Sequence, residues 1–180
     1  FGVATNTDDA EGVATAAVGC ASLSEEQLEA ALAPLRGDIM QVPSTVSAIK
    51  VNGKRAYALA RAGEDVELAA RPVRISRLEV LTPPRPAECI LEESDADNAP
   101  GFQVPSGPVR VVDVDVVVEC SSGTYVRALA RDAGEALGVG AHLTALRRTR
   151  VGEVPLETAM TLEELSAAVE AATPVGESDA

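Results

Sequence analysis

The sequence is poor in aromatic residues: its 180 positions include two tyrosines, two phenylalanines and no tryptophan. Because 46% of the residues are hydrophobic, the chain can still fold around a core, which must be built from valine, leucine, isoleucine and alanine. An aromatic side chain in such a chain is a candidate for a specific role. Tyr57 and Tyr125 are therefore the first residues to explain.

Cysteine and histidine are too few for several kinds of site. The three cysteines, Cys20, Cys89 and Cys120, form no C-x-x-C pair, so the sequence predicts neither a disulfide framework nor a zinc cluster. His142 is the single histidine, so a metal site would have one imidazole at most. We expect no metal and no cofactor, a buried thiol at Cys120 and a structural role for His142.

Long hydrophobic runs are also missing. No apolar stretch approaches the roughly 20 residues of a membrane-spanning helix, and the N-terminus lacks a charged region followed by an apolar one. We therefore expect a cytoplasmic protein without a membrane partner. The sequence opens on Phe1 and not on methionine, and we interpret it as a fragment of a longer protein.

Positive charge is scarce overall but concentrated in two segments. The formal net charge is −13, yet residues 44–77 carry seven basic and three acidic side chains, and residues 127–150 carry five arginines and two acidic side chains. Tyr57 lies inside the first segment, and Tyr125 stands two residues before the second. Basic groups beside scarce aromatic rings favour RNA as a partner. Two alternatives stay open: the basic residues could solvate two helices, or they could bind an acidic protein.

Hydrophobic periodicity and turn residues predict the secondary structure. Helices are expected at 24–37, after Gly123 up to Gly138, and at 161–172, with capping boxes opening the first and the last. Strands are expected at 46–51, followed by an Asn52–Gly53 turn, at 72–81 and at 109–120, and a short helical stretch at 57–61. The hydrophobic phase of the strand at 72–81 changes midway, which predicts a bulge near Ser76 or Arg77.

The fold class that these elements predict is α+β, with a mixed, mostly antiparallel sheet and flanking helices. Alternating valines at 109–120 predict one strand with Val112, Val118 and Cys120 on the same face. Residues 83–108 are rich in proline, glycine and acidic residues, and we expect them to form an exposed loop. One domain is expected over residues 1–172, with a sheet incomplete at the N-terminus and a disordered tail at 173–180.

Three stretches of the sequence together resemble the bacterial TruB-type tRNA pseudouridine-55 synthases. They are GVATNTDDAEG at 2–12, PSTVSAIKVNGKRAYALARAG at 43–63 and CSSGTYVRALARDAGEALGVGAHLTALRRTRVG at 120–152. The resemblance implies isomerisation of a uridine in the T-loop of tRNA: the bond to ribose is broken, the base turns and it is rejoined through carbon. It also implies a T-stem-loop partner, no cofactor and a monomer. We expect a stand-alone enzyme, because the GAH and SAIKVNGKRAY segments are closer in sequence to bacterial members than to the relatives that work with guide RNAs.

The resemblance also assigns roles to single residues. Tyr57 would stack against the flipped uracil, and Tyr125 would lie on the other side of the pocket near the reacting ribose. Arg127 would pair with the catalytic aspartate, because a nearby guanidinium favours the ionised carboxylate and fixes its direction. Lys50 would lie near the pocket, and Leu146 would form an apolar wall of it. Arg147 and Arg148 would contact backbone phosphates.

One departure from the family is the nucleophile. The family's aspartate stands in a G-x-L-D-P motif, which does not occur in the 180 residues, and Asp8 and Asp9 stand in a different context. We expect the motif to lie upstream in the parent protein, with this chain alone holding half a site and being inactive. The alternative hypothesis is a non-catalytic RNA-binding module that retains the base-stacking pocket.

Overall fold

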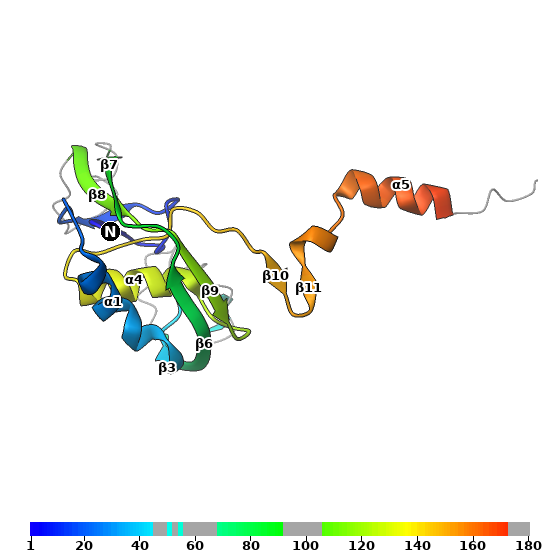
Figure 1. Cartoon of the computed structure of the whole chain (residues 1–180), viewed down its shortest axis with the longest axis horizontal. Coiled ribbons are helices and arrows are strands. Elements are labelled where there is room, and N and C mark those ends of the chain that lie inside the picture. Colours follow the sequence, from blue (N-terminus) through cyan, green and yellow to red (C-terminus); the bar gives the residue numbers. More distant parts are fainter. Residues whose placement is uncertain (45–49, 52–53, 56–67, 92–105, 173–180) are drawn as a thin grey trace, which may run out of the picture. The chain divides into compact units, whose positions relative to one another are not determined.

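The computed structural model describes residues 1–44, 50–51, 54–55, 68–91 and 106–172. The chain divides into two compact units, Phe1–Ala145 and Leu146–Ala180. Among the described residues, the first unit contains two α-helices and most of the strands, and the second contains a short hairpin and one α-helix (Figure 1). The combination of helices with antiparallel sheets confirms the predicted α+β class.

A three-stranded antiparallel sheet forms the centre of the first unit. Its order is β3 (Gly37–Gln41), β6 (Arg71–Val80) and β9 (Val116–Cys120). Helices α1 (Glu25–Leu32) and α4 (Val126–Ala136) lie together beside this sheet (Figure 1). The core between helices and sheet is aliphatic, as the composition requires: Leu28, Leu32, Val73, Ile75, Leu78, Leu129 and Ala133.

The bulge predicted in β6 is confirmed. The register of β6 against β9 shifts between Ile75 and Arg77. Val73 and Ile75 are buried before the shift, and Leu78 is buried after it. The extra residue therefore lets both hydrophobic phases face the same core.

A second hydrophobic cluster is built by two strand pairs. Strand β1 (Val3–Thr5) pairs with β2 (Ala14–Ala17), and β7 (Arg85–Leu91) pairs with β8 (Gly107–Asp113), both antiparallel. The prediction of a loop throughout 83–108 was therefore wrong for β7 and for the start of β8. In β7, alternate residues such as Leu91 pack on the cluster, a signal that the prolines and charges obscured. Residues 92–105 lie outside the described part.

The single strand predicted at 109–120 is two strands. Strand β8 ends at Asp113 and pairs with β7, whereas β9 begins at Val116 and pairs with β6. The predicted common face is thus divided: Val112 is buried and Val118 is partly buried, but Cys120 is exposed. The expectation of a buried thiol at Cys120 was wrong because this residue ends the edge strand β9.

The ends of the helices follow local chemistry. Ser24 caps α1 and forms the predicted capping box with Gln27. Helix α1 ends five residues before Gly37; a 3-10 turn, Ala33–Leu35, follows it, and Gly37, at φ +83°, opens β3 instead of closing the helix. Helix α4 begins after Tyr125 and is followed by Gly138, at φ +70°.

The hairpin predicted around residues 52–53 is confirmed by the antiparallel pairing of β4 (Lys50–Val51) with β5 (Lys54–Arg55). The helix predicted at 57–61 and the tail at 173–180 lie outside the described residues.

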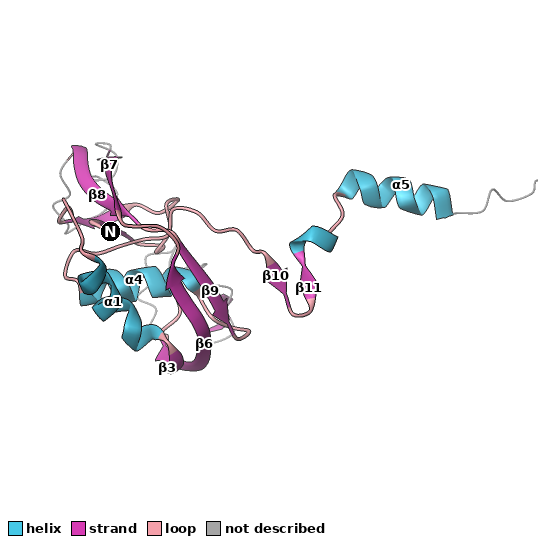
Figure 2. Ribbon diagram, in the orientation of Figure 1, coloured by secondary structure: helices cyan, strands magenta, loops and turns pink. Residues whose placement is uncertain are grey.

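The second unit has a hairpin followed by a helix (Figure 2). Strands β10 (Arg150–Val151) and β11 (Val154–Pro155) pair antiparallel, a short 3-10 turn spans Leu156–Thr158, and α5 covers Leu162–Ala172. The capping box between Thr161 and Glu164 is present in both directions. Within the described ranges of the chain, no helix combines the length and the apolar character that crossing a bilayer requires.

Candidate active site

A tight turn after β1 presents two consecutive aspartates. Asp8 has a left-handed backbone, φ +57°, a region that aspartate tolerates better than most residues. The Thr5 hydroxyl donates to the Asp9 carbonyl (2.8 Å), and the Thr5 hydroxyl oxygen accepts from the Asp9 amide (3.0 Å). A Cβ on Gly12 would come within 2.2 Å of Thr7 Oγ1, so glycine is required to wind this turn.

The segment that follows α4 holds the backbone of this turn. The Leu143 amide donates to the Asp8 carbonyl (3.0 Å), and the Ala10 amide donates to the Leu143 carbonyl (2.9 Å). These two bonds form a parallel bridge between Asp9 and Leu143. His142 lies in the same segment, with Nδ1 2.8 Å from the Val3 carbonyl, which agrees with its expected structural role.

Arg127, in the first turn of α4, forms an ion pair with Asp9. Its Nε lies 2.8 Å from Asp9 Oδ2, and the side chains are 39% and 23% exposed. A guanidinium carries five N–H donors, of which this contact uses the one at Nε. Arg127 was expected to pair with an aspartate outside this chain; the described residues place Asp9 beside it.

Arg131 lies one helical turn after Arg127 and contacts the other aspartate. Its Nη1 lies 3.2 Å from Asp8 Oδ2, and its Nη2 donates to the Val42 carbonyl (2.7 Å). The Ser44 hydroxyl donates to the same Asp8 oxygen (2.6 Å). Asp8 and Ser44 are buried. A buried carboxylate is stable only with partners, and Arg131 and the Ser44 hydroxyl supply them to Asp8.

The backbone of Tyr125 is fixed by a buried amide. Gln41, at the end of β3, donates from Nε2 to the Tyr125 carbonyl (3.1 Å) and accepts from the Tyr125 amide at Oε1 (2.9 Å). Gln41 is only 2% exposed, so both ends of its amide depend on these bonds. Tyr125 therefore occupies the predicted strand-to-helix junction in a fixed main-chain position.

The structure brings together two of the residues that the sequence assigned to the site. Tyr125 and Arg127 lie at the start of α4. Leu146, Arg147 and Arg148 begin the second unit, which is described apart from the first. Tyr57 lies outside the described residues, and only the backbone of Lys50 is described.

Sequence reasoning missed the residues that contact Tyr125 and Arg127 and the ion-pair network beside them. They are Asp8, Asp9, Gln41, Ser44 and Arg131. One signal was present: Arg127 and Arg131 are four apart on a helix and share a face, which suits two neighbouring carboxylates. No local pattern marks Gln41, because its partner is 84 positions away.

Two arginines of the first basic segment are less available to a polyanion than the composition suggested. Arg74 pairs with Asp38 (2.9 Å), and Arg77 pairs with Glu79 (2.8 Å) and Glu119 (3.7 Å). All of these carboxylates come from outside the basic segments. Counting charges along the sequence therefore overstated the positive potential of the first segment.

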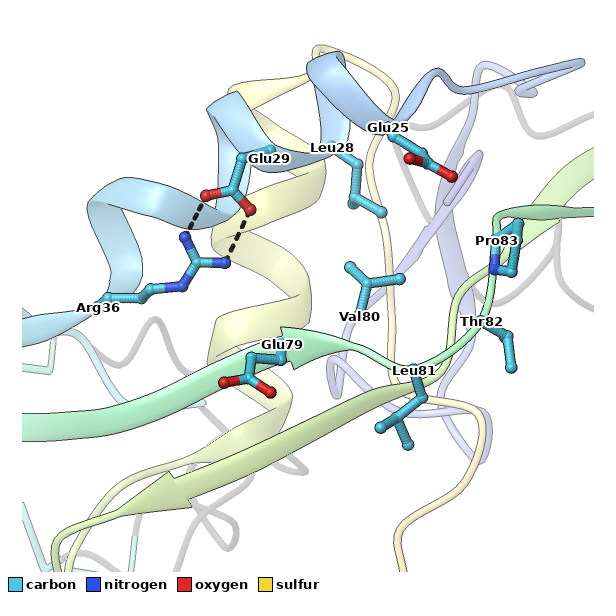
Figure 3. Close-up of a pocket in the computed structure, with 9 residues that line it drawn as sticks. All are labelled: Glu25, Leu28, Glu29, Arg36, Glu79, Val80, Leu81, Thr82 and Pro83. Atoms are coloured by element: carbon cyan, nitrogen blue, oxygen red, sulfur yellow. Dashed lines mark hydrogen bonds and ion pairs between the residues drawn. The ribbon is translucent and has the colours of Figure 1, made fainter.

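A separate open pocket of about 420 Å³ lies between α1 and the end of β6 (Figure 3). Leu28 and Val80 face it, and a two-pronged ion pair between Arg36 and Glu29 closes one side. The hydrogen bond from Arg36 lowers the pKa of the Glu29 carboxyl below its ordinary value. The pocket contains none of the sequence-predicted site residues. No group of three histidines, cysteines or carboxylates suited to a metal occurs in the described part of the chain.

Comparison with known proteins gives two family matches. Residues 1–126 match the model of the TruB family pseudouridylate synthase N-terminal domain, and residues 127–178 match that of the tRNA pseudouridylate synthase B C-terminal domain. This division falls after the first residue of α4, whereas the two units of the structure divide after Ala145.

Curated relatives carry the name tRNA pseudouridine synthase B. The protein of Mycobacteroides abscessus is 57% identical over 166 residues, covering 92% of this chain and 49% of the relative. That of Nocardia farcinica is 56% identical over 166 residues (92% and 47%), and that of an Arthrobacter species 54% over 170 residues (94% and 49%). The chain thus spans about half the length of the relatives it matches.

Proposed function

Because the chain belongs to the TruB family of pseudouridylate synthases, we propose that the protein containing it isomerises a uridine in the T-loop of tRNA to pseudouridine. The observation that carries the proposal is the cluster at the start of α4, where a tyrosine and an arginine are held by buried or half-buried partners. Such anchoring suits groups that must keep a fixed direction toward a substrate.

In this proposal Arg127 pairs with the nucleophilic aspartate of the parent protein. Its contact with Asp9 uses Nε, which orients the guanidinium plane while other N–H donors of the group serve a second carboxylate. An arginine beside that carboxylate favours its ionised form, the form able to attack the sugar or base. Asp9 is then a positioning residue, because it acts through Arg127.

The remaining residues have the roles that the resemblance implies. Tyr57 stacks on the extruded uracil and Tyr125 lies across the pocket near the ribose; stacking on an aromatic ring stabilises an extruded base by roughly 1 to 3 kcal/mol. Lys50 lies near the pocket, Leu146 forms an apolar wall, and Arg147 and Arg148 contact phosphates of the T-stem-loop. We further infer a cytoplasmic monomer, since the substrate is tRNA and no subunit contact is needed for this scheme.

The test is tritium release from a T-stem-loop RNA carrying 5-tritiated uridine, with RNA binding measured in the same samples. The full-length protein should release tritium, Arg127→Met should bind RNA without release, and the 180-residue chain alone should release none. Binding by the full-length protein without release would favour the non-catalytic RNA-binding module. Release by the 180-residue chain would show that a carboxylate within it is the nucleophile.

A further inference from the structure

Asp8 connects two elements on which the position of Arg127 depends. Its Oδ2 accepts hydrogen bonds from Ser44, just after β3, and from Arg131, in the second turn of α4. The residue is 8% exposed, so water competes little for these contacts. One buried carboxylate therefore connects the segment that follows the edge strand β3 to the helix that carries Arg127.

The two aspartates and the two arginines could pair in more than one way. Arg127 and Arg131 lie one turn apart on the same face of α4, and Asp8 and Asp9 are adjacent in the turn. Charge alone does not distinguish the observed pairs, Asp9 with Arg127 and Asp8 with Arg131, from the exchanged ones. Further contacts must select between them.

The selecting contacts gather on Asp8 and Arg131. Ser44 donates a hydrogen bond to the same Asp8 oxygen that faces Arg131, and Asp8 has a left-handed backbone. Arg131 also donates to the Val42 carbonyl (2.7 Å) and to Asp132 Oδ1, from Nη2 (2.8 Å) and from Nε (2.9 Å). This half of the network is more buried than the pair of Arg127 with Asp9, with side chains 21% and 11% exposed.

We propose that Asp8 is a positioning residue that neutralises Arg131 and thereby reserves Asp9 for Arg127, fixing the direction of the Arg127 guanidinium. In the absence of the Asp8 charge, Arg131 competes for Asp9. In the absence of Arg131, the buried carboxylate of Asp8 competes for Arg127. The effect on reaction rate rests on the proposed function, but the effect on the Arg127–Asp9 contact does not.

Two substitutions separate these effects. Asp8→Asn removes the charge but keeps the size, an acceptor oxygen and tolerance of the left-handed backbone. Arg131→Gln removes the competing cation. Each single change should disturb Arg127, whereas the double variant contains neither competitor and should restore it. Asp132→Asn is the matched control, because it removes a carboxylate from Arg131 without affecting the Asp8 charge.

The experiment uses the full-length protein, with hydrogen exchange of the Arg127 Nε–H followed by NMR and tritium release measured per folded molecule. Each single variant should raise the exchange rate and lower the release rate by about tenfold, with the tRNA Kd changed by less than about threefold. The double variant should return both quantities to within about threefold of the unsubstituted protein.

Several outcomes would overturn the proposal. If Tm falls in the single variants while exchange and rate per folded molecule stay within about twofold, Asp8 is only structural. A double variant worse than either single variant, or an Asp132→Asn effect equal to that of Asp8→Asn, contradicts the competition. If the unsubstituted protein releases no tritium, the proposed function fails, and the exchange of the Arg127 Nε–H alone decides the role of Asp8.

Discussion

Arginines occur in two settings in the first unit, across the sheets and along α4. Three of those on the strands, Arg74, Arg77 and Arg85, pair with carboxylates at the surface, where both partners are between 43% and 78% exposed. Those on α4, Arg127 and Arg131, pair with Asp9 and Asp8 at lower exposure. Exposed pairs contribute little and are screened by salt, whereas buried pairs hold a geometry. The burial of an arginine's ion pair therefore indicates whether its geometry is held, whereas its position in a basic segment does not.

The largest contrast should appear in the reaction rate. Replacing Arg127 by lysine removes the planar fork that can hold Asp9 and a second carboxylate together, and we expect tritium release to fall on the order of 10²-fold or more. Arg85→Lys keeps a cation beside Asp115 and should leave the rate within about twofold. Equal losses in the two variants would remove the distinction between the two settings.

The next largest difference between the arginines of α4 and those of the strands should appear in the free energy of unfolding. Arg131→Met leaves the Asp8 carboxylate buried with one hydroxyl partner, and we expect the free energy of unfolding to fall by about 2 to 4 kcal/mol. Arg77→Met, on the sheet, should cost far less, because its pairs are exposed to solvent. Urea unfolding of the full-length protein measures both values. A loss at Arg77 as large as that at Arg131 would mean that burial does not control the strength of these pairs.

The neutral side chain of Gln41 tests whether a charge is needed to fix a residue at the start of α4. Gln41→Leu removes both hydrogen bonds to the backbone of Tyr125 and leaves its amide and carbonyl without these partners, which should cost about 2 to 3 kcal/mol of unfolding free energy. Gln41→Glu keeps the acceptor but buries a carboxylate against the Tyr125 carbonyl, and it should cost at least as much. Were Gln41→Leu as stable as the unsubstituted protein, the Gln41 amide would not be what fixes Tyr125.

The smallest effect is expected at the exposed pair of Arg36 with Glu29. Because the pKa of Glu29 is lowered by the hydrogen bond from Arg36, the contribution of this pair to stability is present at neutral pH and is lost as the pH falls through the lowered pKa. NMR titration should find the pKa of Glu29 higher in Arg36→Met than in the unsubstituted protein. An unchanged pKa would show that the pair does not persist in solution.

Local signals predicted the elements well where the pattern was self-contained. Capping boxes located α1 and α5, and the change of hydrophobic phase located the bulge in β6. The division of residues 109–120 between two sheets was not predictable, because alternating valines suit one long strand as well as two. Strand β7 was missed since Pro86 and two charged residues interrupt its hydrophobic pattern, although its pairing with β8 is regular.

The candidate site shows the same limit. Tyr125 and Arg127 were found because a family motif surrounds them, while their partners come from positions more than 80 residues distant, such as Gln41 and Asp9. The sequence also gave no means to tell that Arg74 faces Asp38 across a strand pair. Contacts between distant segments follow from the packed fold, and composition of a segment does not reveal them.

The passage of the chain from β8 to β9 has a consequence for folding. Within the two residues Val114 and Asp115 the backbone leaves the sheet pair that covers one hydrophobic cluster and enters the sheet that covers the other. Strand β8 packs on one cluster and β9 on the other, and only these two residues join them, so displacement of one strand should strain the other. The two clusters of the first unit should therefore unfold together, at one denaturant concentration, as a single cooperative transition.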